Sequence, residues 1–296
     1  MDVNGLPVYP EARPIGEEDI TLLVSAWRSA YFPPSDTSPA NIFGWRCAYD
    51  YNISRWGDSI VISGRYRGRK FVFPPLGSKN EVVDVVRWLF DKEKDLILPC
   101  APLWLAKEMV GLGFKIASDR ANWDYVYRSD ALANLSGEKY HAKRNLIKQF
   151  VRNYSAQVED LTEKVCKEAI RFSDKWCVQR DCEKDESLKM ERCAVQEMLR
   201  SAPSLGLSGI AVKIDGEICA IAVGEEASPD TYLVHVEKGN HQYRGIYQFI
   251  NQKLAERVAP LYRWINREQD LGRDGLRRAK LSYHPSRMEK KFLISL

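Results

Sequence analysis

The sequence predicts an α/β protein in which mixed, mostly antiparallel sheets are flanked by helices. Some segments repeat apolar residues at helical spacing, and shorter runs rich in β-branched and aromatic residues lie between glycine turns. These helical and strand patterns follow the same order in both halves of the chain. We therefore predict two units of one plan, residues 1–130 and residues 131–296, each with helices, an antiparallel meander, and then a helix and a strand.

The composition is that of a globular chain with a large core. Hydrophobic residues make up 45% of the 296 positions and charged residues 28%, and 8 Trp and 14 Tyr supply large side chains for the core. The net charge of +4 permits an anionic partner without requiring one. No apolar stretch approaches the roughly 20 residues that span a bilayer, and the N-terminus lacks the pattern of a secretory signal. We therefore expect no integral membrane segment and a cytoplasmic location.

The cysteines and histidines give no sign of a metal site. The 7 cysteines are scattered and odd in number, and no two of them form a Cys-x-x-Cys pair. The 4 histidines share no ligand spacing with them. We therefore expect free thiols in a reducing compartment and no bound metal.

The first half is predicted to begin with a helix at 15–31, where three acidic residues suit a helix N-terminus. Glycine turns then separate three expected strands of a meander, at 42–49, 59–63 and 70–73. A helix at 80–91, a strand at 95–99, a helix at 101–112 and a strand at 122–127 complete this half.

The second half repeats this order. Helices are predicted at 140–152, 161–176 and 187–199, and Asp215-Gly216 predicts a hairpin between strands at 207–213 and 217–225. A strand at 231–236, a loop at 237–245, a helix at 246–258 and a strand at 262–265 follow. A short helix at 276–280 and an edge strand at 291–296 end the chain.

The predicted helix at 140–152 is strongly basic on its polar face. No acidic residue occurs between Lys139 and Arg152, and Lys143, Arg144 and Lys148 lie between them. Such a face is a candidate for binding the acceptor end of a tRNA or another polyanion. A solvated helix surface is an equally good interpretation for Lys139, Lys148 and Arg152.

A meander whose third strand leads through a loop into a helix is the order of the acyl-CoA N-acetyltransferase (GNAT) fold. In that fold the step from loop to helix offers backbone N–H groups to a pyrophosphate. Here only Arg244-Gly245 matches the glycine-rich pattern, and Tyr247 stands at the second glycine position. The signal for coenzyme A is therefore weak, and Gly239 and Gly245 are equally consistent with ordinary turns.

A polar cluster is expected where the strand at 262–265 ends. Asn266, Arg267, Glu268 and Asp270 follow the strand directly, and Lys280, Ser282 and Tyr283 come before Pro285. Ligands collect at strand ends in α/β sheets, so this stretch is a candidate site. A surface ion-pair cluster that caps the strand is the alternative.

These residues resemble a known family. The chain is similar to proteins that carry the C-terminal domain of phosphatidylglycerol lysyltransferase, a tandem GNAT-like fold, and looks closest to soluble stand-alone members. The matching stretches are Asn41 to Trp45, Trp123 to Tyr127, Leu135 to Phe150, Gly206 to Gly216, His235 to Lys238, Gly245 with Asn251, and Asn266-Arg267-Glu268-x-Asp270-Leu271-Gly272 followed by Lys280-Leu281-Ser282-Tyr283-x-Pro285.

The resemblance implies acyl transfer, with an aminoacyl-tRNA as the donor. That reaction needs a path for the proton of the nucleophile, donors for the developing oxyanion and cations for the donor's phosphates. Candidates for proton transfer are Glu237, Glu268 and Asp270, and candidates for the oxyanion are Asn145, Asn266 and Tyr283. Candidates for holding the donor are Lys143, Arg144, Asn145, Lys238, Arg244, Gly245, Arg267 and Lys280.

We therefore predict a GNAT-like acyltransferase that moves an aminoacyl group from aminoacyl-tRNA to an unidentified amine or hydroxyl. An acetyl-CoA-dependent N-acetyltransferase and a non-catalytic GNAT-like module that binds a ligand are the alternatives. His235 is interpreted as a strand residue with a satisfied ring rather than as a base.

Overall fold

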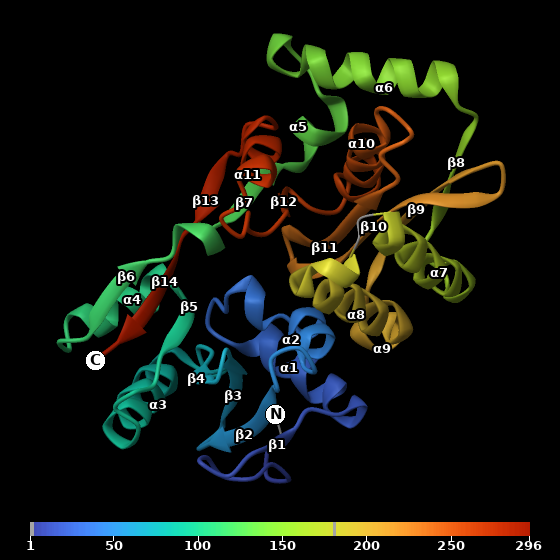
Figure 1. The fold of residues 1–296 in the computed structure, drawn as a ribbon. Coiled ribbons are helices and arrows are strands. Elements are labelled where there is room, and N and C mark those ends of the chain that lie inside the picture. Colours follow the sequence, from blue (N-terminus) through green and yellow to red (C-terminus); the bar gives the residue numbers. More distant parts are fainter. Residues whose placement is uncertain (1–2, 180–181) are drawn as a thin grey trace. The chain divides into compact units, whose positions relative to one another are not determined.

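A computed structural model describes residues 3–179 and 182–296. The chain forms two compact units (Figure 1). The first comprises the chain up to Asp124 together with Gln269–Arg273 and Glu289–Leu296, and the second comprises Tyr125–Glu268 and Asp274–Met288. The division at residue 130 stays a prediction.

The first unit contains two antiparallel sheets. One has the order β1-β2-β3-β4 and the other the order β5-β14-β6. The strands are β1 (Arg13–Pro14), β2 (Asn52–Trp56), β3 (Ser59–Tyr66), β4 (Arg69–Val72), β5 (Leu98–Pro102), β6 (Lys115–Ser118) and β14 (Lys291–Ser295). The helices are α1 (Ile20–Ser29), α2 (Pro39–Trp45), α3 (Lys79–Lys92) and α4 (Leu103–Val110). The predicted strand at the C-terminus is thus confirmed as β14, but its predicted place at an edge is wrong, because β14 pairs with β5 on one side and β6 on the other.

The predicted strand at 42–49 is wrong, because this segment forms most of α2. Ser38 caps the helix by accepting the backbone N–H of Asn41 on its hydroxyl at 3.3 Å, and Pro39 takes the first helical position. Every residue from 39 to 44 is buried, so the segment carries no one-sided helical pattern. The first strand of the meander is instead β2, which was not predicted.

The second unit is built on a seven-stranded sheet with the order β13-β7-β12-β11-β10-β9-β8. The strands are β7 (Asp124–Arg128), β8 (Ala156–Asp160), β9 (Ser208–Ile214), β10 (Glu217–Ser228), β11 (Thr231–Gly239), β12 (Trp264–Asn266) and β13 (Arg287–Glu289). The helices are α5 (Ser129–Asn134), α6 (His141–Asn153), α7 (Glu163–Gln179), α8 (Glu186–Arg200), α9 (Ala202–Leu205), α10 (Ile246–Val258) and α11 (Asp274–Leu281). Strand β8, at the edge of the sheet, was not predicted.

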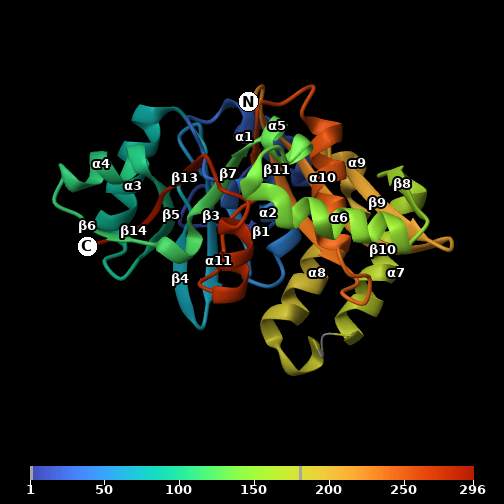
Figure 2. The same cartoon turned by 90° about the horizontal axis from the view of Figure 1, so that it is seen from above.

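The predicted GNAT-like order is confirmed in this sheet. Strands β9, β10 and β11 form an antiparallel meander, α10 follows, and β12 returns parallel to β11. Figure 2 shows α10 on one side of these strands and the pair α7 and α8 on the other. Phe249, Ile250 and Leu254 of α10 pack with Ala220 and Ala222 of β10 in the main core of the unit. The mixed α/β class with mostly antiparallel sheets is therefore confirmed.

The prediction that all cysteines are free thiols is wrong for two of them. Cys177 and Cys182 form a disulfide with a Cα–Cα distance of 5.2 Å. Their separation of 5 residues is not a Cys-x-x-Cys pair, so no sequence motif predicted the disulfide. Cys47, Cys100, Cys166, Cys193 and Cys219 are free thiols.

Two further properties concern the residues that the structure describes. No helix among them combines the length and the apolar character needed to cross a membrane. No group of three or more metal-binding side chains occurs among them either.

Candidate functional site

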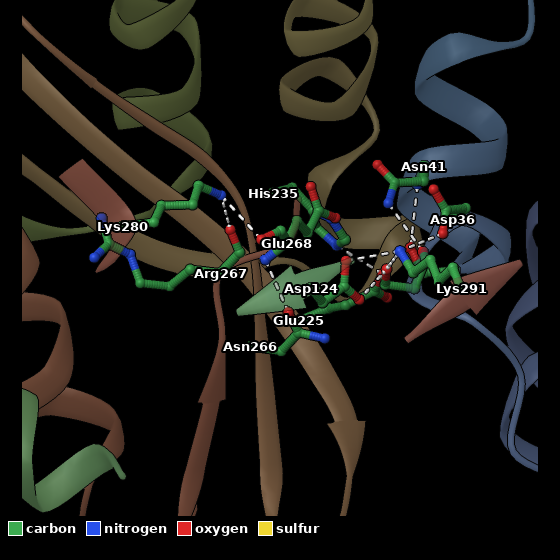
Figure 3. A network of polar contacts seen from close by, with 12 residues as sticks. Asp36, Asn41, Asp124, Glu225, His235, Asn266, Arg267, Glu268, Lys280 and Lys291 are labelled. Carbon is green, nitrogen blue, oxygen red and sulfur yellow. Dashed lines mark hydrogen bonds and ion pairs between the residues drawn. The ribbon is translucent and has the colours of Figure 1, made fainter. Parts of the chain in front are cut away.

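The backbone turn at Glu268 is held in an unusual conformation. Strand β12 ends at Asn266, and two residues later Glu268 has a φ of +54°, in the left-handed region that costs a side chain about 1–2 kcal/mol. The side-chain oxygen of Asn266 accepts the N–H of Glu268 at 2.8 Å. The ammonium of Lys280, which is 8% exposed, donates to the carbonyls of Arg267 and Glu268, the latter at 3.1 Å (Figure 3). Several contacts therefore fix a strained residue, as occurs at functional sites.

The imidazole ring of His235 lies between the carboxylates of Glu268 and Glu225. Its Nδ1 lies 2.8 Å from Oε1 of Glu268, and its Nε2 lies 2.9 Å from Oε1 of Glu225 (Figure 3). The imidazole side chain is 0% exposed and that of Glu225 6%. The side chain of Glu268 is 14% exposed, so this carboxylate is the member of the trio that reaches the surface most.

A β-bulge puts His235 in this position. Val236 pairs with Val223 and Val234 pairs with Gly224, which leaves His235 as an extra residue on β11. A Cβ atom on Gly224 would lie 2.0 Å from the carbonyl oxygen of Leu233, so only glycine fits opposite the bulge. Bulges of this kind redirect a side chain next to functional sites.

The charge on His235 follows from its partners. Burial on its own would lower the pKa of the ring, but the hydrogen bonds with Glu225 and Glu268 raise it to about 10. Carboxylates only accept hydrogen bonds, so both ring nitrogens donate and the imidazolium form is favoured. The trio is thus a buried cation between two acids.

Glu237 forms a second cluster in the same unit. Its Oε1 accepts from Nη2 of Arg267 at 2.9 Å, and its Oε2 accepts from Nδ2 of Asn251 at 3.0 Å. Glu237 lies on β11, Asn251 on α10 and Arg267 directly after β12. Three separate elements of the GNAT-like core therefore converge on this carboxylate.

Both residues that hold Glu237 keep one buried atom unsatisfied. Nη1 of Arg267 and Oδ1 of Asn251 have no hydrogen-bond partner within the described part of the chain. Asn251 is 3% exposed, and the side chains of Arg267 and Glu237 are 12% and 14% exposed. A buried donor and a buried acceptor without partners are costly, at about 1–3 kcal/mol each, unless water or a ligand satisfies them.

Tyr283 packs beside Arg267 as part of an aromatic and cationic group. The guanidinium carbon of Arg267 lies 4.9 Å from the centre of the Tyr283 ring, and Nζ of Lys143 lies 4.2 Å from it. Lys143 also donates to Ser282 Oγ at 2.6 Å, and burial together with the charge of Arg267 lowers its pKa. Tyr283 is 4% exposed, and its pKa is raised by burial. Lys143 and Tyr283 therefore lie at this site.

Four other predicted residues lie elsewhere in the second unit. Arg144 Nη1 donates to the carbonyls of Leu135 and Gly137, at 2.5 and 2.6 Å, and so holds the segment that leads into α6. Lys238 pairs with Glu191 at 2.6 Å and lies 3.7 Å from the centre of the Trp176 ring. The structure places Asn145 next to His141 on α6, at 3.3 Å, and leaves Arg244 exposed.

Gly245 has a packing role in the loop before α10. Its φ is +94°, and a Cβ atom there would lie 2.4 Å from the carbonyl oxygen of Leu146 on α6. The backbone N–H groups of Asn240, Tyr243 and Ile246 donate to carbonyls within the protein. Three N–H groups of the loop and the helix start therefore already have partners within the protein.

Asp270 belongs to the first unit. It is 0% exposed, pairs with Arg120 at 3.1 Å and accepts the N–H of Gly272 at 2.8 Å. The first unit also buries Lys291, whose ammonium contacts Asp36 at 2.5 Å and Asp124 at 2.7 Å (Figure 3). We had not predicted this second polar network.

The exposed face of α6 carries a polar stripe. Asn145, Lys148, Gln149 and Arg152 line a shallow hollow of about 200 Å³. Neither an ion pair nor a hydrogen bond involves the side chains of Lys148, Gln149 or Arg152 in residues 3–179 and 182–296. Two cations one helical turn apart are thus left available to an external anion.

Sequence reasoning missed Glu225, Asn251 and the role of His235. The predicted meander puts the strands of Glu225 and His235 next to each other, but a single sequence does not specify the register between them. The bulge that redirects the ring has no clear sequence signal beyond Gly224. Asn251 belongs to the matched motifs, but it lies on α10, where its buried neighbours are apolar, and it was not named as a site residue.

Comparisons with known proteins are consistent with this architecture. The sequence pattern described as phosphatidylglycerol lysyltransferase, C-terminal, matches residues 29–295. A crystal structure of a conserved protein of unknown function from Bacteroides thetaiotaomicron VPI-5482 is similar with a TM-score of 0.87 and 30% identity, over 96% of this chain and 99% of that one. The comparison with curated proteins gives no match.

Two further solved structures share the fold at low identity. The C-terminal domain of a putative lysylphosphatidylglycerol synthetase from Agrobacterium fabrum has a TM-score of 0.69 and 15% identity, over 94% of this chain and 91% of that one. L-PGS from Bacillus licheniformis has a TM-score of 0.67 and 14% identity, over 95% and 91%.

Proposed function

Because the chain belongs to the phosphatidylglycerol lysyltransferase C-terminal family, we propose that it transfers an aminoacyl group from aminoacyl-tRNA to an amine or hydroxyl acceptor. The family and the GNAT-like sheet support an acyltransferase-like fold. The choice of donor and the residue roles below are our proposal.

Glu268 is the general base of this reaction. Its side chain is 14% exposed, so an acceptor can reach the carboxylate. Its backbone is held by Asn266 and Lys280, so the residue keeps one orientation. It takes the proton of the acceptor as the acceptor's N or O attacks the acyl carbon. The bond between that carbon and the ester oxygen then breaks, and the tRNA leaves with its terminal hydroxyl restored by a proton from solvent.

The observation that carries the proposal is the unsatisfied pair next to Glu237. An aminoacyl ester offers a carbonyl oxygen, which accepts hydrogen bonds, and an α-ammonium, which donates them. Nη1 of Arg267 supplies a donor for the carbonyl and for the oxyanion that develops from it, and Oδ1 of Asn251 supplies an acceptor for the ammonium. A plain acetyl group has no ammonium and leaves Asn251 unsatisfied, so this pair favours an aminoacyl donor over acetyl-CoA.

The stripe on α6 suits the RNA part of such a donor. Lys148 and Arg152 are exposed cations without an intramolecular partner in the described residues, and Asn145 and Gln149 offer amides between them. Lysine and arginine side chains bind phosphodiesters, and amides add hydrogen bonds to phosphate and sugar oxygens.

Binding of purified tRNA tests the donor part of the proposal. We expect charged and uncharged tRNA to bind, with an affinity that falls steeply as salt rises. The double change Lys148→Ala and Arg152→Ala should reduce the slope of log K against log salt by about 1–2. Lys167→Ala, at an exposed lysine that already pairs with Glu163, serves as the matched control and should leave the slope unchanged.

Two outcomes would overturn the choice of donor. Thermal stabilisation by acetyl-CoA without any tRNA complex would favour an N-acetyltransferase. The absence of binding to either would favour a non-catalytic module.

A further inference from the structure

We propose that His235, supported by Glu225, is a positioning residue that holds the Glu268 carboxylate in its reactive direction. This inference rests on the proposed function, in which Glu268 is the base. His235 itself does not touch the acceptor, because its imidazole is 0% exposed and both of its ring nitrogens already face carboxylates.

The buried ring of His235 holds the side chain of Glu268. Nδ1 of His235 lies 2.8 Å from Oε1 of Glu268, whereas the backbone of Glu268 is bound separately by Asn266 and Lys280. Side chain and main chain therefore have different partners. The bond to the imidazole therefore acts on the orientation of the carboxylate itself.

Glu225 determines whether the His235 ring donates to Glu268 as a charged imidazolium or as a neutral imidazole. Glu225 on β10 and Glu268 after β12 are the titratable groups that face the ring. With both carboxylates present the ring donates from both nitrogens as an imidazolium, which favours the charged form of the carboxylate in front of it. With a glutamine at 225, the side-chain amide donates to Nε2, and the ring becomes neutral while still donating from Nδ1.

The local fold is specialised for this arrangement. His235 is the extra residue of a bulge that only glycine at 224 permits, and a regular ladder would put residues 234 and 236 on one face and His235 on the other. A purely structural core position would favour an apolar residue here, because a buried ion pair gains little over a hydrophobic pair of the same size. The bulge instead brings together three charged groups, Glu225, His235 and Glu268, and this indicates a role in the chemistry.

The first test measures the ring directly and needs no substrate. Long-range nitrogen–proton NMR of protein labelled at its 4 histidines reports which ring nitrogens carry protons, and His235→Gln assigns the signal. We expect both nitrogens of His235 to be protonated at neutral pH, and Glu225→Gln to convert the ring to a neutral form with one proton. Glu226→Gln changes the exposed neighbouring carboxylate, which accepts from Tyr262, and should leave the signal unchanged.

The second test measures how Glu268 works. In Glu225→Gln we expect kcat to fall about tenfold, with KM for the donor unchanged, because a neutral ring gives Glu268 a weaker hydrogen bond and holds its carboxylate less firmly. The acid limb of the pH profile of kcat should also move up by about one pH unit, since a neutral ring favours the anion less. A role in folding alone would lower the thermal midpoint without moving this limb.

The outcomes separate this inference from the proposed function. If wild-type protein consumes no donor, the proposed function fails, and the NMR result still decides whether His235 is an imidazolium set by Glu225. If the ring stays doubly protonated in Glu225→Gln, or if kcat and its acid limb match those of wild type, the positioning role is wrong. His235→Asn, if it folds, should lose kcat to at least the same extent.

Discussion

Replacing Lys280 by methionine removes the ammonium that holds the turn at Glu268. Methionine has a similar length and keeps the apolar stem of the side chain in place. The change removes donation to the carbonyls of Arg267 and Glu268, while the carbonyl of Glu268 still accepts from the N–H of Tyr125 at 3.2 Å. The turn therefore loses its charged support and keeps its neutral hydrogen bonds, among them the one from the N–H of Glu268 to the side-chain oxygen of Asn266.

The magnitude follows from these contacts. A hydrogen bond to a charged group contributes about 1.5–3 kcal/mol, so two of them suggest a loss of about 3–6 kcal/mol. Relaxation of the positive φ at Glu268 returns about 1–2 kcal/mol, and an 8% exposed ammonium no longer has to be desolvated. We expect a net loss of about 2–3 kcal/mol, which corresponds to about 4–12 °C in the thermal midpoint.

Urea unfolding followed by circular dichroism measures this loss, and thermal unfolding checks it. The matched control is Arg278→Met on the same helix, where the cation is exposed and the change should stay within about 0.5 kcal/mol. If Lys280→Met unfolds at the wild-type urea concentration, Lys280 does not hold the turn, and the argument for a preorganised Glu268 loses its main support.

Three further predictions concern pH, the loop before α10 and the buried lysine. The pKa of His235 is about 10 when folded and 6.5 in its ordinary state, so its stabilisation is complete below pH 6.5 and is lost as pH rises towards 10. The difference in unfolding free energy between wild type and Glu225→Gln should therefore shrink over that window in urea titrations, and a constant difference would contradict the ion-pair account. Gly245→Ala should lower the unfolding free energy by about 2–4 kcal/mol in urea, whereas Gly275→Ala, with nothing within 4 Å of the added atom, should not lower it. Lys291→Met should cost about 3–5 kcal/mol by leaving Asp36 and Asp124 without their cation, and a wild-type thermal midpoint would show that the network contributes nothing.

The parts of the fold that sequence reasoning predicted well have a local cause. The hairpin at Asp215-Gly216, the meander and α10 follow from turn residues and apolar spacing, and the strand at the C-terminus follows from its apolar run. Helix α2 was predicted as a strand because the segment is buried on all sides, which removes the periodicity that distinguishes the two.

The residues of the candidate site also fall into two groups, those that local sequence predicted and those that depend on three-dimensional packing. Glu237, Glu268, Arg267, Lys280 and Tyr283 were named as candidates because polar residues crowd the ends of the strands that the sequence predicts. Glu225 and Asn251 were missed because their partners are brought to them by sheet register and helix packing, which a single sequence does not specify. Arg144 and Lys238 were selected for their charge within stretches that match the family, and each has an internal partner that only three-dimensional packing reveals.

The most direct test of the central claim is a single-turnover assay of Glu268→Gln. Excess protein would be mixed with tRNA carrying a labelled amino acid, over a panel of amino acids with amine and hydroxyl acceptors, and loss of the label from the tRNA would be followed. We predict that wild type releases the label from at least one donor, while Glu268→Gln is at least 100-fold slower and keeps its tRNA affinity within about twofold. Equal rates in the two proteins would show that Glu268 is not the base and would contradict the account.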